Sequence, residues 1–317
     1  MIFPVFDLHC DTALALLGAD LMGGNALRKN STHIDLERAS KLPGYAQCFA
    51  CFTTPAFCEW YQVSPVTAFE REMGMILSQI EQNSDLIRQA YTAQEVRKNY
   101  ENGLMSGILT IEGPAGFDFD PALLEDLYNV GFRISTLGWN EQNVLTGSQK
   151  TGGGLTELGR EYVREAQRVG MIVDVSHISD EGFWDIVEIA EKPIIASHSN
   201  SRAVCDEPRN LTDDMFRAIY QTGGVAGINQ YAAFLGAKPD LDTVCDHILH
   251  FLEIDPEGDH IALGGDLDGC DELADGFDGV QSYPDMARRL LARGVGEKIV
   301  HKIYWDNALE VMEKCCI

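Results

Sequence analysis

Positive charge is scarce in this sequence. The 317 residues contain 24 lysines and arginines against 49 aspartates and glutamates, which gives a formal net charge of −25 at pH 7. A protein that binds nucleic acid needs a basic surface to neutralise phosphates, and an anionic membrane surface repels a protein of this charge. We therefore expect neither nucleic acid nor a membrane as a partner.

Long apolar runs and export signals are also lacking. No run reaches the roughly 18 apolar residues that a membrane-spanning helix needs. The opening MIFPVFDLHCDTALALLGAD has no basic leading segment, and three polar residues interrupt its apolar stretch. A secretory signal peptide would show the opposite pattern. The number of cysteines, nine, is odd, which favours free thiols over a disulfide framework, so we expect a cytoplasmic protein.

Motifs that cradle nucleotide phosphates are absent as well. Neither GxGxxG nor GxxxxGK[ST] occurs, and no Pro/Ser-rich linker or charge block marks a domain boundary. The 45% hydrophobic composition is typical of a globular protein with a large core. The sequence therefore predicts a single domain over residues 1–317.

Eight short apolar runs recur along the chain and predict strands. They cover residues 5–10, 46–52, 107–112, 132–137, 171–176, 193–197, 224–229 and 260–266. Their nearly continuous apolar character is typical of a parallel sheet buried on both faces. Segments with helical periodicity lie between them, at 155–169, 179–190, 212–221 and 242–252. This alternation predicts a (β/α)₈ TIM-type barrel, with extra helices after the second strand within 53–103.

Chemically reactive side chains stand at the carboxyl ends of these runs. They are His9, Asp11, Glu112, His177, His198 and Asp266. Active sites of such barrels are built from strand ends, so we expect these side chains to meet at one mouth. Imidazoles and carboxylates together are the ligands of two-metal hydrolytic sites and suit Zn²⁺, while Mn²⁺, Fe²⁺ and Co²⁺ stay open. Cys10 alternates to the opposite face of its strand.

The remaining histidines have simpler explanations. A single histidine is more often structural than catalytic, so the metal prediction depends on the coincidence at several strand ends. His247 and His250 lie three residues apart on a predicted helix, where packing or capping suffices. His33, His260 and His301 receive no chemical role.

Five segments, taken in chain order, carry a family resemblance. They are FDLHCDT, TIEGP, GLTELGREYVREAQRVGMIVDVSHIS, IIASHSNSRAVCDEPRNLTDD and LGGDLDG. They resemble the membrane (renal) dipeptidase family of zinc metallopeptidases, within the amidohydrolase-like barrels. The similarity runs from about Val5 to Glu313. The sequence shows no secretion or lipid-anchor signal, and in this respect it is closer to the soluble bacterial-type members of the family.

The resemblance implies a binuclear zinc enzyme. In that family pattern His9 and Asp11 hold one metal, His177 and His198 hold the other, and Glu112 bridges the two. It also implies a homodimer.

Further roles follow from the same resemblance. Asp266 matches the catalytic acid/base, and Arg209 matches the residue that binds the carboxylate of the dipeptide, a task for which a planar guanidinium is suited. Asp268 is expected to cap the following turn. Tyr231, after the seventh strand, is a candidate pocket residue, although a buried tyrosine with one hydrogen bond would explain it as well.

The sequence departs from the mammalian pattern at two positions. Trp139 stands where those members place a substrate-contacting histidine. Asn140 or Asn143 could supply the missing hydrogen bond, or all three could simply pack the loop. Phe234 stands near the position where the mammalian members have another pocket tyrosine, so their preference for substrate side chains does not transfer to this chain.

The resulting hypothesis is hydrolysis of a dipeptide's amide bond by a hydroxide held between two metals. Asp266 would accept the proton of the nucleophile and deliver it to the departing amine. The resemblance implies tolerance of a carboxy-terminal D-residue. One alternative keeps the barrel and changes the substrate to a lactone, a cyclic amide or an N-acyl amino acid. Another is a non-catalytic binding protein, which predicts missing ligands, whereas all are present.

Overall fold

The computed structural model describes residues 2–20 and 27–316. Its strands form one parallel sheet in the order β7-β6-β5-β4-β2-β1-β9-β8. The bridge between Ala196 and Ala226 connects the two ends of this path and closes the barrel. The strands are β1 Val5–Cys10, β2 Tyr45–Phe52, β4 Met105–Glu112, β5 Phe132–Thr136, β6 Ile172–Asp174, β7 Ile194–Ile195, β8 Ala226–Ile228 and β9 Ile261–Leu263. The predicted (β/α)₈ barrel is confirmed.

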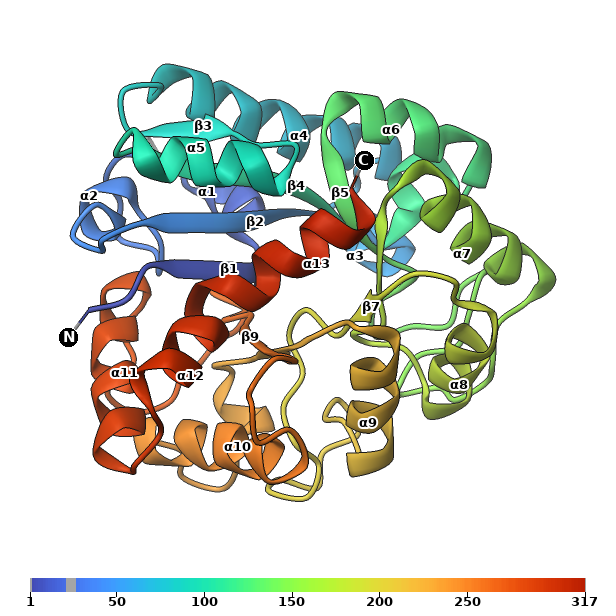
Figure 1. The fold of residues 1–317 in the computed structure, drawn as a ribbon. Coiled ribbons are helices and arrows are strands. Elements are labelled where there is room, and N and C mark those ends of the chain that lie inside the picture. The colour runs from blue at the N-terminus through green and yellow to red at the C-terminus, as the bar shows by residue number, and fades with distance from the viewer. Residues whose placement is uncertain (1, 21–26, 317) are drawn as a thin grey trace.

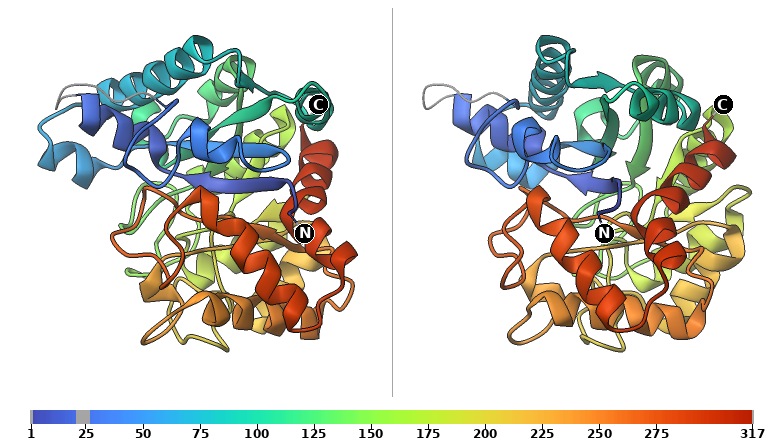
Figure 2. Two further views of the ribbon diagram at one scale, coloured as in Figure 1. Left: turned by 90° about the vertical axis from the view of Figure 1, so that its left-hand side faces the viewer. Right: turned by 60° about the vertical axis from the view of Figure 1, so that its left-hand side comes forward.

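Helices surround the strands (Figure 1 and Figure 2). They are α1 Thr12–Asp20, α2 Leu36–Ala39, α6 Leu124–Val130, α7 Glu157–Val169, α8 Asp180–Ile189, α9 Asp213–Thr222, α10 Leu241–Ile254, α11 Tyr283–Ala292, α12 Glu297–His301 and α13 Asn307–Cys315. The side chains of Thr156, Ser179 and Thr212 accept hydrogen bonds from backbone N–H groups in the first turns of α7, α8 and α9. These caps explain why the helices begin where the sequence predicted.

The segment after β2 contains the predicted extra helices and one strand that the sequence did not predict. The helices are α3 Pro55–Trp60, α4 Pro65–Gln82 and α5 Ala93–Glu101. The unexpected strand is β3 Ile87–Gln89, which pairs in parallel with β4 outside the barrel path. Three residues are too few to show a strand period, so this strand depends on its partner.

The strands of the second half are shorter than predicted. β6 ends at Asp174 and β7 at Ile195, whereas the apolar runs continue to residues 176 and 197. The Asp174 carboxylate accepts hydrogen bonds from the backbone N–H groups of Ser176 and Ser197, each at 2.9 Å. A side chain thus takes over from ladder bonding, and the chain turns early toward the barrel mouth.

The barrel interior is closed at its amino-terminal end by the end of the chain. Phe6, Ile172 and other residues from the early parts of the strands form one buried cluster with Trp305 and α13. The rings of Phe6 and Trp305 lie 6.0 Å apart. In Figure 1, α13 crosses in front of the strands. The opposite end, where the strands finish, therefore remains available for a site.

A bulge in β1 sets the direction of His9. Asp7 pairs with Gln47 but Cys10 pairs with Phe49, so three steps along β1 match two along β2. The Oδ1 atom of Asp7 accepts the N–H groups of His9 and Gly265, both at 3.0 Å, and Oδ2 accepts the hydroxyl of Tyr283 on α11. Residues two apart in a regular strand share a face, but the bulge lets Asp7 face the outer helix while His9 faces the mouth.

We predict that Asp7→Ala lowers the free energy of unfolding by about 3 kcal/mol, because it leaves buried N–H groups without an acceptor. Asp7→Asn is the matched control. Both N–H groups bond to a single oxygen, so the amide retains that acceptor, and the variant should lose less than half as much stability. Urea unfolding measures both values, and equal losses would contradict this account of the bulge.

Candidate active site

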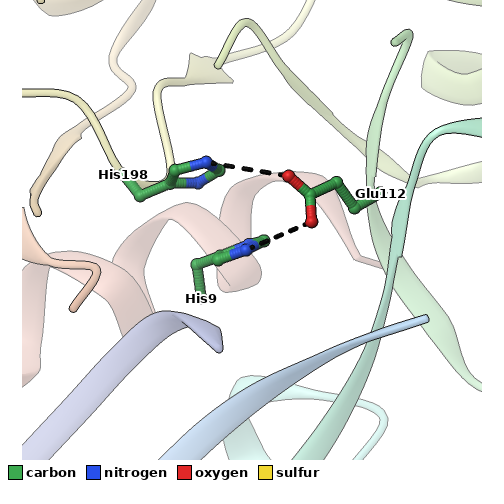
Figure 3. A group of neighbouring side chains, drawn as sticks. All are labelled: His9, Glu112 and His198. Atoms are coloured by element: carbon green, nitrogen blue, oxygen red, sulfur yellow. Dashed lines mark ion pairs between the residues drawn. The ribbon is translucent and has the colours of Figure 1, made fainter. Parts of the chain in front are cut away.

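The six predicted strand-end residues lie together at the mouth of the barrel, and all are buried. His9 and Asp11 come from the end of β1, and Glu112 is the last residue of β4. The Nε2 atom of His9 lies 3.4 Å from Asp11 Oδ2, 3.4 Å from Glu112 Oε2 and 3.9 Å from Asp266 Oδ1. Figure 3 shows His9 and His198 on one side of the Glu112 carboxylate.

Glu112 faces two groups of side chains with its two oxygens. Oε2 points to His9, whereas Oε1 lies 3.0 Å from His177 Nε2 and 3.9 Å from His198 Nε2. The Nε2 atoms of His177 and His198 are 2.9 Å apart. A carboxylate between two sets of lone pairs has the geometry of a bridging ligand.

Two of these residues have left-handed backbone conformations. His177 has a φ of 70° and Asp266 a φ of 57°. A side chain makes this conformation costly, by about 1–3 kcal/mol, so neighbouring contacts must hold it. The backbone carbonyl of His177 accepts the N–H of Gln149 at 3.0 Å, and Asp266 donates its own N–H to the carbonyl of His9 at 3.2 Å.

Neighbouring side chains orient the second pair of imidazoles. The Nδ1 atom of His177 lies 3.2 Å from Asn140 Oδ1, which can only accept a hydrogen bond, so Nδ1 carries the proton. The Nδ1 atom of His198 lies 2.6 Å from the Ser197 hydroxyl, which donates to Asp174 Oδ2. Both contacts leave the Nε2 lone pairs directed at Glu112, as metal-ligating histidines require.

Electrostatics at the mouth favour a bound cation. Burial, reinforced by the Asp11 charge, raises the pKa of Glu112 to about 7. Burial likewise raises the pKa of Asp266 to about 6. Burial also holds the pKa values of His177 and His198 well below the usual range, so both imidazoles are neutral. Neutral imidazoles beside buried carboxylates form a suitable donor set for divalent metals.

Two unpartnered atoms support the same fit. His9 Nε2 and Asp11 Oδ1 are buried without a hydrogen bond. Burial alone would lower the pKa of His9, but Glu112 and Asp11 outweigh it and raise the pKa well above its ordinary value. The ligand atoms of His9, Glu112 and His198, and those of His9, Asp11 and Asp266, lie close enough together to hold a metal ion.

A cavity of about 580 Å³ opens over the cluster. Its walls include Asp11, Glu112, His177 and Asp266 together with residues that the sequence proposed for substrate binding, namely Trp139, Asn140, Arg209 and Tyr231. This volume is within the range for small-molecule sites.

Arg209 is a buried cation without a carboxylate partner. Its Nη1 donates to Ser199 Oγ at 3.1 Å and its Nη2 to the carbonyl of His198 at 3.2 Å, while Nε is unpartnered. Its guanidinium carbon lies 5.3 Å from the centre of the Phe234 ring. Burial lowers its pKa. No carboxylate of the described residues is within ion-pair distance of this guanidinium, which can therefore accept an anion from the cavity.

In the loop after β5, Asn143 follows the packing alternative that the sequence left open. Asn143 accepts from the backbone N–H groups of Leu145 and Thr146 and donates to the carbonyl of Leu137, so it packs the loop. Asn140 does line the cavity, but its oxygen is occupied by His177 and by the Gln149 amide. The ring of Trp139 lies edge-on to Phe52, with centroids 5.1 Å apart.

Asp268 does not cap the following turn as expected. Its carboxylate accepts from Thr12 Oγ1 at 2.7 Å, Thr32 Oγ1 at 3.2 Å and the His33 N–H at 2.5 Å. The reason is a tertiary contact, because the loop preceding α2 folds over the end of β9. Asp268 thus fixes one edge of the mouth.

Cys10 and the helical histidines take structural positions. The Cys10 side chain joins the outer core cluster, as strand alternation predicts. His247 is buried between the backbone N–H of Ser201 and the carbonyl of Leu235. His250 pairs with Asp213 at 2.8 Å.

Sequence reasoning missed Asn229, which follows β8. Its Nδ2 donates to Asp266 Oδ2 at 3.0 Å, and its Oδ1 accepts the N–H of Tyr231 at 2.6 Å. Its position directly after an apolar strand was the available signal, but an amide is not a metal ligand, so the search for ligands passed over it.

Comparisons with known proteins identify the family of this chain. The model of the family "Membrane dipeptidase (Peptidase family M19)" matches residues 2–316. An uncharacterized dipeptidase of Schizosaccharomyces pombe is 35% identical over 224 residues, which cover 68% of this chain and 55% of that protein. No helix among the described residues combines the length and apolar character needed to cross a membrane.

Two solved structures have the same fold over nearly the whole chain. A metallo peptidase from Rhodobacter sphaeroides, liganded with a phosphinate mimic of the dipeptide L-Ala-D-Ala, is 26% identical with a TM-score of 0.88 and covers 99% of this chain and 100% of its own. The dipeptidase AC, a metallo peptidase of family M19, is 28% identical with a TM-score of 0.89 and covers 100% of this chain and 99% of its own. The chain belongs to the membrane dipeptidase family, peptidase family M19, and is therefore a metallo-dipeptidase.

Proposed function

We propose that this chain hydrolyses the amide bond of dipeptides that have a free carboxylate, including those with a carboxy-terminal D-residue. The observation that carries the proposal is that the unpaired Arg209 guanidinium and the metal-ligand cluster line one cavity. An endopeptidase substrate offers no carboxylate next to the scissile bond. The L-Ala-D-Ala mimic bound by the Rhodobacter relative supports acceptance of the D-residue.

The proposed cofactor is a pair of zinc ions. His9 and Asp11 would hold one ion, His177 and His198 the other, and the two oxygens of Glu112 would face both. Zinc supplies the Lewis acidity that polarises a carbonyl and activates water for attack.

The side chains of this chain would perform the remaining steps. Arg209 would bind the substrate carboxylate and so place the amide beside the ligand cluster. Asn229 holds Asp266 Oδ2, which leaves Oδ1 directed toward His9 at 3.9 Å. From there Asp266 would accept the proton of the attacking water and donate it to the departing nitrogen. Trp139, Asn140 and Tyr231 would shape the pocket around the substrate.

Assembly and location are part of the same proposal. All nine cysteines are free, as in a reducing cytoplasm. Trp60 and Tyr61, which are 83% and 63% exposed, offer apolar surface for a homodimer. Residues 1–317 would act as one barrel domain.

The function is tested with L,L and L,D dipeptides and zinc-reconstituted protein. We expect hydrolysis of both series, and its loss in Glu112→Gln together with loss of bound zinc. Glu161→Gln, on the exposed face of α7, is the control and should retain activity. Protein that holds zinc but hydrolyses none of the dipeptides would overturn the proposal and favour another amide or an ester.

Asp266→Asn tests the proton transfer. The amide can keep a hydrogen bond with Asn229 but cannot accept the proton, so kcat should fall by a factor of about 10² or more while zinc content stays unchanged. Steady-state kinetics and metal analysis measure the two effects. Asp275→Asn, in an exposed loop, should match the wild type, and an Asp266→Asn variant with full kcat would show that another group moves the proton.

Arg209→Met tests carboxylate binding while preserving side-chain length. Removing one partner of a buried charge pair costs about 2 kcal/mol or more, so KM for Ala-Ala should rise roughly 30-fold or more. KM for Ala-Ala amide, which has no carboxylate, should not change. An equal rise for both substrates would mean that Arg209 only supports the structure.

A further inference from the structure

Among the described residues, the lysine and arginine side chains that line the cavity are Arg209 and Lys150. Lys150 is exposed, and no carboxylate in the described part of the chain lies within ion-pair distance of its ammonium. Among the described residues only two of the nine lysines, Lys29 and Lys302, form ion pairs, and Lys150 is the unpaired lysine that lines the cavity. Its charge has no role in the mechanism above.

The backbone that carries Lys150 is fixed to the metal-ligand side of the cavity. Gln149, the preceding residue, donates its N–H to the carbonyl of His177 at 3.0 Å. The hydroxyl of Ser148 accepts the N–H of Lys150 at 3.2 Å and donates to the carbonyl of Asn140 at 3.0 Å. Ser148 also pairs with Ile178. Lys150 therefore projects from an anchored turn, on a different wall from Arg209, which follows β7.

The charges of an ordinary dipeptide leave Lys150 without a partner. The substrate carboxylate is assigned to Arg209. Glu207 and Asp271 line the cavity without side-chain partners among the described residues and suit the substrate ammonium. A dipeptide with uncharged side chains has no charge besides its two termini, so the ammonium of Lys150 would stay unpaired in the complex.

We propose that Lys150 binds a side-chain carboxylate of the substrate, and that the enzyme therefore prefers dipeptides containing aspartate or glutamate. This inference rests on the proposed dipeptidase function. A carboxylate reaching Lys150 would gain a charge-assisted hydrogen bond in a partly enclosed site, where screening is weaker than on an open surface.

The experiment compares acidic dipeptides with their neutral isosteres, Ala-Asp with Ala-Asn and Asp-Ala with Asn-Ala. The wild type should show a kcat/KM about tenfold higher for at least one acidic member, equivalent to about 1.4 kcal/mol. Lys150→Met should abolish this difference and leave the neutral dipeptides unchanged. Lys150→Glu should reverse the preference between Ala-Asp and Ala-Lys. Lys41→Met, an exposed lysine outside the cavity, is the matched control.

Two results would overturn the inference while leaving the dipeptidase function intact. An equal fall on all four dipeptides in Lys150→Met would mean that Lys150 binds a group common to every dipeptide, such as the scissile carbonyl. An unchanged acidic preference in that variant would exclude Lys150 as its source. Wild-type protein that hydrolyses no dipeptide overturns the proposed function first, before any variant is compared.

Discussion

The structure depends on a concentration of buried carboxylates at the mouth of the barrel. Asp11, Glu112 and Asp266 all lie within 4 Å of the same His9 nitrogen. Burying like charges together is costly, and it is reflected in the raised pKa values of Glu112 and Asp266. Bound divalent cations would offset this cost, which links the folding of the mouth to metal binding.

The surrounding polar residues hold the backbone that presents these ligands. All three of these residues are buried: Asp7 lies directly before the bulge in β1, Asp174 ends β6, and Asn229 follows β8. Their side chains satisfy backbone groups that the sheet no longer pairs, or hold a reactive carboxylate in one orientation. The left-handed conformations of His177 and Asp266 persist because such contacts surround them. The strands β6 and β7 are short because side-chain hydrogen bonds replace the sheet hydrogen bonds where the site begins.

The sequence predicted the barrel, and it predicted that these side chains meet at its mouth, because both signals are local. An apolar run indicates a buried strand, and a histidine or carboxylate directly after the run indicates a side chain at the mouth of the barrel. Contacts between distant segments were not predictable in this way. The bulge at Asp7 needs Gly265 and Tyr283, the role of Asp268 needs Thr12, and Asn140 contacts His177 only in the folded chain. The sequence did not predict β3 for the same reason, because this strand is stabilised by its pairing with β4.

The central claim is that Glu112 stands between two metal positions. Anomalous diffraction at the zinc edge, from crystals of the zinc-loaded protein, tests it most directly. We predict two peaks, one beside His9 and Asp11 and one beside His177 and His198, with one Glu112 oxygen facing each. A single peak, or two peaks that do not flank Glu112, would contradict the account.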